Sequence, residues 1–146
     1  MSFGVSVGDL IQVGTLSWNL YRGCRDSSIE FKRISQEVAS LHVVIKEPEE
    51  QFAESRGLSP TRAQRLAFLV EGTNDVLQDL KRLLDGYETL GTQAQRTWDR
   101  MRWGMEDLTD VRSRLISNTT LITAFNSALA RYMYQVPSIA NNTNNP

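Results

Sequence analysis

Between Phe31 and Leu90, most apolar residues recur at alternating intervals of three and four, and this spacing limits the fold more than any other feature. Two series carry it: Phe31, Ile34, Val38, Leu41, Ile45 and Phe52, then Leu66, Leu69, Thr73, Val76, Leu80, Leu83, Tyr87 and Leu90. Such spacing keeps one face of an α-helix apolar. Strand-like alternation of useful length is absent from the sequence. We therefore expect long amphipathic helices over about 27–54 and 60–90.

Capping residues and prolines place the ends of these helices. Ser27 with Glu30 three residues later has the pattern of a capping box, and Ser59 before Pro60 predicts the start of the next helix. Pro48 lies inside the first of these helices. Because proline lacks a backbone donor and clashes with the preceding turn, we expect a kink after which the helix resumes, or else a break.

A further helical pattern covers about 92–134 and begins with Thr92 and Gln95 as a second capping box. As one straight rod it would be roughly 60 Å long, which is too long for so small a domain. We expect a bend at Gly104 or, in preference, at 117–120, where helix propensity is low.

The fold class that follows is all-α, an antiparallel up-and-down helical bundle of four to five long helices. A chain of 146 residues with 40% hydrophobic residues is long enough to bury one continuous core. We expect a single domain over 1–136. Residues 137–146 are too polar to pack and are expected to be a tail or linker.

The N-terminal segment is unusual because Asp9 is the only charged residue in 3–21. A helix over about 5–23 would place Gln12, Thr15, Asn19 and Arg22 on one narrow polar face. A helix apolar on the rest of its circumference is either the central helix of the bundle or a segment that packs at rest and is released to a membrane. The inserting surface would then consist of Phe3, Val5, Val7, Leu10, Ile11, Leu16 and Trp18. A permanent transmembrane span is not expected, since Gln12 and Asn19 are costly in hydrocarbon.

The composition argues against catalytic activity and against binding to nucleic acid. Sixteen basic and seventeen acidic residues give a net charge of −1, so nucleic acid is not an expected partner. With one histidine, His42, and one cysteine, Cys24, the chain has no obvious catalytic pair or thiolate metal cluster. We expect no enzyme activity, no cofactor, no metal and no small-molecule substrate. A single cysteine also fits a reducing, cytoplasmic location.

A basic and aromatic strip is a second candidate interface. Arg96, Arg100 and Arg102 interleave with Trp98 and Trp103, which suits phosphate or lipid headgroups. Alternatively, Trp98 continues the core stripe, and Asp99 pairs with Arg102 three residues on.

Several stretches resemble a known group of domains. Residues 2–9 (SFGVSVGD), 18–21 (WNLY), 34–42 (ISQEVASLH), 97–104 (TWDRMRWG) and 117–121 (SNTTL) look like the N-terminal helical domain of fungal multidomain proteins that carry NACHT or ankyrin-repeat regions. More distantly, the chain resembles HeLo and HeLo-like domains and the four-helix executioner domain of the mixed-lineage kinase-like protein. This resemblance implies a cell-death or immune signalling domain that oligomerises and acts on membranes through its first helix.

Two hypotheses follow. In the first, the chain is a fungal HeLo-like signalling domain that is recruited from the cytoplasm to an anionic membrane when its first helix is released on oligomerisation. In the second, it is a protein–protein interaction or oligomerisation module that never contacts lipid. The protein partner would be a further copy or a downstream signalling domain.

Overall fold

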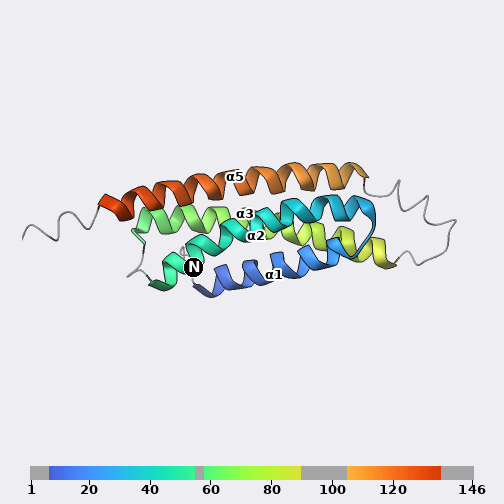
Figure 1. The fold of residues 1–146 in the computed structure, drawn as a ribbon, viewed down its shortest axis with the longest axis horizontal. Helices are drawn as coiled ribbons and strands as arrows, with labels where there is room; N and C mark the ends of the chain where they lie inside the picture. Colours follow the sequence, from blue (N-terminus) through green and yellow to red (C-terminus); the bar gives the residue numbers. More distant parts are fainter. Residues whose placement is uncertain (1–6, 55–57, 90–104, 136–146) are drawn as a thin grey trace, which may run out of the picture.

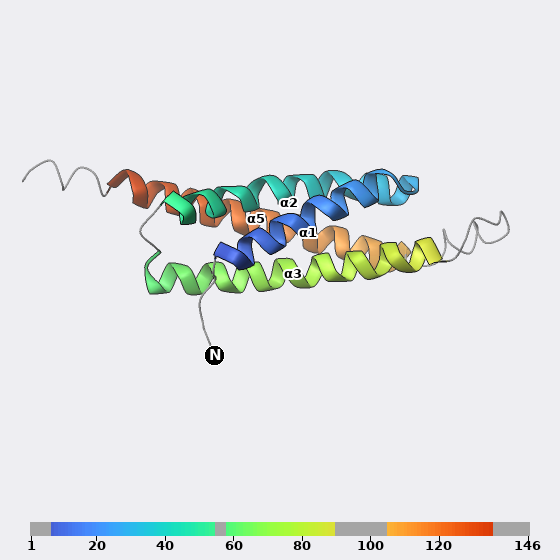
Figure 2. The same ribbon diagram turned by 90° about the horizontal axis from the view of Figure 1, so that it is seen from below.

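The computed structural model describes residues 7–54, 58–89 and 105–135, and in this part the chain forms helices without any strand. Four helices lie side by side: α1 (Val7–Arg25), α2 (Ile29–Glu54), α3 (Pro60–Thr89) and α5 (Met105–Gln135) (Figures 1 and 2). The predicted all-α helical bundle is therefore confirmed.

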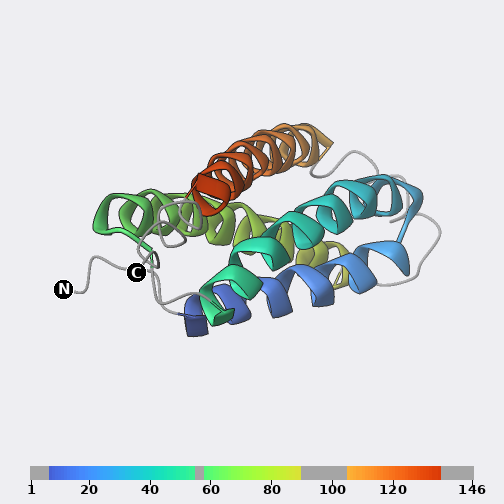
Figure 3. The same ribbon diagram turned by 60° about the vertical axis from the view of Figure 1, so that its left-hand side comes forward.

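Each described helix packs along two of the others. α1 contacts α2 and α3, and α5 also contacts α2 and α3. Figure 3 shows α1 and α5 on opposite sides of the bundle with α2 and α3 between them. The order around the bundle is thus α1, α2, α5, α3, so the α1–α2 side and the α3–α5 side face in opposite directions.

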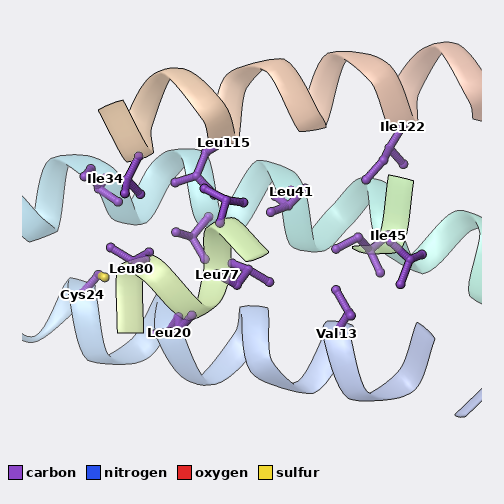
Figure 4. Packing of buried hydrophobic residues seen from close by; sticks show 14 of the residues in the cluster. Val13, Leu20, Cys24, Ile34, Leu41, Ile45, Leu77, Leu80, Leu115 and Ile122 are labelled. Atoms are coloured by element: carbon purple, nitrogen blue, oxygen red, sulfur yellow. The ribbon is translucent and has the colours of Figure 1, made fainter. Parts of the chain in front are cut away.

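The two apolar stripes predicted from the sequence meet in one core. Of the six α2 positions of the stripe, the five whose side chains the structure describes are buried, at Phe31, Ile34, Val38, Leu41 and Ile45. The α3 stripe is buried at Leu66, Thr73, Val76 and Leu80, whereas three further positions are only partly buried, at Leu69, Leu83 and Tyr87. Figure 4 shows side chains from all four helices in this core, with Leu115 and Ile122 contributed by α5.

The start of α2 differs from the expected one. The helix begins at Ile29, and the first backbone bond of its ladder runs from the Lys32 amide to the Ser28 carbonyl at 2.8 Å. Ser28 therefore stands in the cap position that we had assigned to Ser27. Further along, α2 continues through the buried Pro48 to Glu54, so the helix resumes after the proline and the predicted alternative of a break is wrong.

The start of α3 is the one predicted. Pro60 is its first residue, and the Ser59 hydroxyl accepts a hydrogen bond from the Arg62 amide at 3.3 Å. This bond satisfies one of the amides that a helix N-terminus leaves without an intrahelical partner.

Replacing Ser59 with alanine should remove this cap and lower the free energy of unfolding by about 1 kcal/mol. Urea titration followed by circular dichroism measures the loss. Thr61→Ala, two residues on at an exposed position, is the matched control and should change stability by less than about 0.5 kcal/mol. Equal losses in the two variants would show that the cap bond contributes nothing.

The last segment is one helix at the site where we expect a bend. α5 runs without interruption from Met105 to Gln135, through residues 117–120. The polar side chains there bond to the carbonyl one turn earlier: Asn118 to Arg114 at 2.8 Å, Thr119 to Leu115 at 2.8 Å and Thr120 to Ile116 at 2.9 Å. Such bonds to the i−4 carbonyl use the side-chain donors inside the helix, and they are also associated with helix bending. The alternative site, Gly104, immediately precedes α5 but lies outside the described residues, as do 92–103 and the predicted tail at 137–146.

Candidate functional site

The structure divides the predicted inserting surface between the core and the outside of the bundle. Leu10 is 1% exposed and Leu16 is partly buried, whereas Ile11 and Trp18 are 47% and 46% exposed. Phe3 and Val5 lie outside the described residues, and Val7 begins α1 without a described side chain. In the resting bundle α1 is therefore neither a central helix buried all round nor a fully exposed one.

The buried side of α1 follows the ordinary spacing of an amphipathic helix. It consists of Leu10, Val13, Ser17, Leu20 and Cys24, which contact the common core (Figure 4). The predicted polar face, Gln12, Thr15, Asn19 and Arg22, is exposed throughout.

A polar contact between α1 and α2 is centred on His42. The buried Ser17 hydroxyl donates to the Gly14 carbonyl at 2.7 Å, and the His42 Nδ1 atom lies 2.8 Å from the same hydroxyl and 3.1 Å from the same carbonyl. Since a carbonyl oxygen only accepts, this geometry suits a proton on Nδ1. The Trp18 ring packs against the imidazole with centroids 5.3 Å apart. The contact fixes α1 on α2, and the hydroxyl is too deeply buried to meet a substrate.

Cys24 is equally unsuited to covalent chemistry. Its side chain is fully buried, and burial, with a smaller contribution from Glu88, raises the pKa of the thiol to about 12. The thiolate is the nucleophile, so the folded protein should not react through this residue. Among the residues that the structure describes, no group of three His, Cys, Asp or Glu side chains is arranged to hold a metal ion.

An apolar groove lies between α3 and α5 on the surface of the described bundle. It has a volume of about 580 Å³ and is lined by Thr61, Gln64, Arg65, Phe68, Leu69, Leu121, Phe125 and Ala128. Phe68 is 76% exposed and Leu121 is 52% exposed, while Phe125 and Leu69 form a partly buried floor. We call these eight residues the α3–α5 groove.

The charges at the N-terminal end of α3, where the α3–α5 groove begins, are basic, whereas the exposed Glu71 and Asp75 follow further along α3, three and seven residues after Phe68. Arg65 lines the groove itself, and the Arg62 guanidinium stacks 4.0 Å from the centre of the Tyr132 ring at its end. Arg131 lies on α5 beside Tyr132, and neither 60–70 nor 117–135 contains an aspartate or glutamate. The groove thus combines exposed apolar side chains with a rim that is positive at the end nearest Arg62 and Arg131.

Sequence reasoning missed the groove because its prominent residues lie off the core stripes. Phe68 stands between the stripe positions 66 and 69, and Leu121 directly precedes the buried Ile122. The sequence did contain one indication of the groove: Phe68 is a large apolar residue on the side of its helix that faces away from the core stripe. The candidate strip predicted at Arg96, Arg100, Arg102 and Trp103 lies outside the described residues.

Comparison of the chain with family models, with curated proteins and with solved structures finds no match. Among the described helices, none combines the length and the apolar character that crossing a bilayer requires.

Proposed function

We propose that this domain is a fungal signalling module of the HeLo-like type, of the cell-death or immune class, that associates with further copies of itself while its helices stay packed. The observation that carries the proposal is the exposure of Phe68 at the edge of the apolar α3–α5 groove. Contiguous exposed apolar side chains around an aromatic anchor are typical of protein-binding surfaces. The sequence resemblance supplies the signalling class.

The packing of α1 supports association of intact bundles over release of the helix. Leu10, Val13 and Leu20 are buried in the common core. Burying side chains of this kind stabilises by about 1.5–3 kcal/mol each. Together they approach the whole stability of a small domain, which is about 5–15 kcal/mol. A partner would have to supply an energy of that size to extract α1.

We also propose how the domain acts, how its helices are arranged and where it works. The domain acts by binding and not as an enzyme. This fits the burial of Ser17 and Cys24, whose side chains could otherwise serve as nucleophiles. Its helices form an antiparallel up-and-down bundle of four to five members, in keeping with the short link between α1 and α2. It works in the cytoplasm.

Sedimentation velocity over a range of protein concentrations tests the proposal. The wild-type domain should form oligomers as its concentration rises, and Phe68→Asp should stay monomeric with an unchanged melting temperature, because position 68 is exposed. The matched control is Ile29→Asp, which also replaces an exposed apolar residue but at the first residue of α2, and it should associate like the wild type. A wild-type domain that is monomeric at every concentration would contradict the proposal.

A second candidate function is membrane action through α1. It is favoured by Ile11 and Trp18, two exposed apolar side chains seven residues apart on the outer side of α1. Such a pair can rest on a bilayer surface. Leakage of dye from anionic vesicles, lost in Ile11→Glu, would support this function.

A further inference from the structure

A second apolar surface lies on the opposite side of the bundle from the α3–α5 groove. Three side chains are exposed there, Ile11 and Trp18 of α1 and Val43 of α2, and Val43 directly follows His42, whose ring packs against Trp18. The same stretch of α2 carries Glu47 and Glu50, both exposed. We call these five residues the α1–α2 surface. It combines apolar side chains with the Glu47 and Glu50 carboxylates, which can pair with the groove's arginines, although the exposed Arg22 follows Trp18 by one turn.

The two surfaces lie at the same level along the bundle. The Asn126 amide of α5, next to the groove residue Phe125, donates to the Val44 carbonyl of α2 at 2.9 Å. On the other flank, Gln12 and Val13 of α1 line a shared hollow with Ala67 and Val70 of α3. The groove and the α1–α2 surface are therefore back to back, without a large offset along the axis.

The charges at the groove and at the α1–α2 surface distinguish between two modes of self-association. Two grooves meeting face to face would bring Arg62, Arg65 and Arg131 of both copies into one interface, where like charges repel. A groove meeting the α1–α2 surface brings arginines to Glu47 and Glu50 and apolar side chains to apolar side chains. Lys46 lies in the same stretch of α2 but is paired with Glu49 at 3.2 Å, so it opposes this contact little.

We infer that copies of this domain associate heterologously, with the α1–α2 surface of one copy seated on the α3–α5 groove of the next. This inference rests on the proposed function of self-association and names its contact. Because both surfaces lie back to back at one level, each added copy presents a fresh groove or a fresh α1–α2 surface. Such contacts extend into rows or close into rings, and they do not stop at a dimer.

Complementation between two half-blocked variants tests the contact. One variant, Phe68→Asp with Leu121→Asp, blocks the groove, and the other, Ile11→Asp with Val43→Asp, blocks the α1–α2 surface. All four positions are exposed, so both variants should melt like the wild type. Each alone should be monomeric by sedimentation velocity. An equal mixture should form a dimer of the two variants that grows no further, because only one intact groove and one intact surface remain in each pair.

Exchanging charges across the proposed contact tests it independently. Arg65→Glu should weaken association by at least about tenfold, and mixing it with a Glu47→Lys, Glu50→Lys partner should restore the contact. Raising the salt concentration should weaken wild-type association, because partly exposed charges are screened.

The outcomes separate this inference from the proposed function. A wild-type domain that never associates overturns both. A wild-type domain that associates, with the groove variant monomeric and the α1–α2 variant still dimeric, overturns the inference alone and indicates a face-to-face groove contact. Association that survives in both half-blocked variants also overturns the inference, since it places the contact elsewhere on the domain.

Discussion

A chain lacking residues 2–20 is expected to be unfolded. The deletion removes Leu10, Val13, Ser17 and Leu20 from the core and exposes the apolar side chains of α2 and α3 that they cover. The lost burial approaches the total stability of a domain of this size, about 5–15 kcal/mol. Circular dichroism should show loss of the cooperative thermal transition. A deletion variant that keeps a cooperative transition near that of the full chain would instead show that α1 is dispensable to the bundle.

Substitutions at two neighbouring positions of α1 test which side of the helix is buried. Leu10→Glu places a charge without a partner at a position that is almost fully buried, and it should cost about 3–5 kcal/mol. Ile11→Glu introduces the same side chain on the outer side of α1 and should change stability by less than about 0.5 kcal/mol. Equal effects at the two positions would mean that α1 does not present the buried side described above.

Leu80→Ala has the second large expected effect. Leu80 is fully buried where α3 meets the core, and truncating such a residue leaves a cavity that costs about 2–5 kcal/mol. Urea titration measures the loss. Leu69→Ala should cost less, because Leu69 is only partly buried on the floor of the groove.

The exposed neighbour Phe68 is the control for this comparison. Phe68→Ala should change the free energy of unfolding by less than about 0.5 kcal/mol, although a larger side chain is removed. A loss for Leu80→Ala as small as that for Phe68→Ala would contradict the assignment of the α3 stripe to the core.

The sequence predicted the helices and their core better than the outer surfaces. The stripes of α2 and α3 are found because burial requires a residue every three or four positions, and Val38 and Val76 meet this requirement in the fold. The cap at Ser59 is found because it depends on only a few neighbouring residues. At 117–120, low propensity does not end α5, and the asparagine and threonine side chains there bond to carbonyls of their own helix.

The orientation of α1 could not be derived from its sequence. Apolar or small residues occupy most of its circumference, so Leu10 and Ile11 look equivalent until α2 and α3 select the buried side. The α3–α5 groove was missed for a related reason. It is formed by residues from segments more than fifty positions apart, such as Phe68 and Leu121, and only the packing of the helices brings them together.

Cys24 allows a direct measurement of whether the domain works with α1 in place. It is the chain's one cysteine, it ends the buried side of α1, and its pKa of about 12 keeps the thiol protonated in the bundle. Release of α1 would expose it and return its pKa towards the ordinary value, so the rate of alkylation reports on release.

The measurement is the rate at which monobromobimane, a small uncharged reagent, labels Cys24 near neutral pH, with and without vesicles that contain phosphatidylglycerol. Urea-unfolded protein gives the rate for a fully exposed thiol. We expect labelling of the oligomeric wild-type domain to remain far slower than in urea and to be unchanged by vesicles. Labelling that rises towards the unfolded rate when vesicles are added, and that stays slow with uncharged phosphatidylcholine vesicles, would contradict the account and favour release of α1 to the membrane.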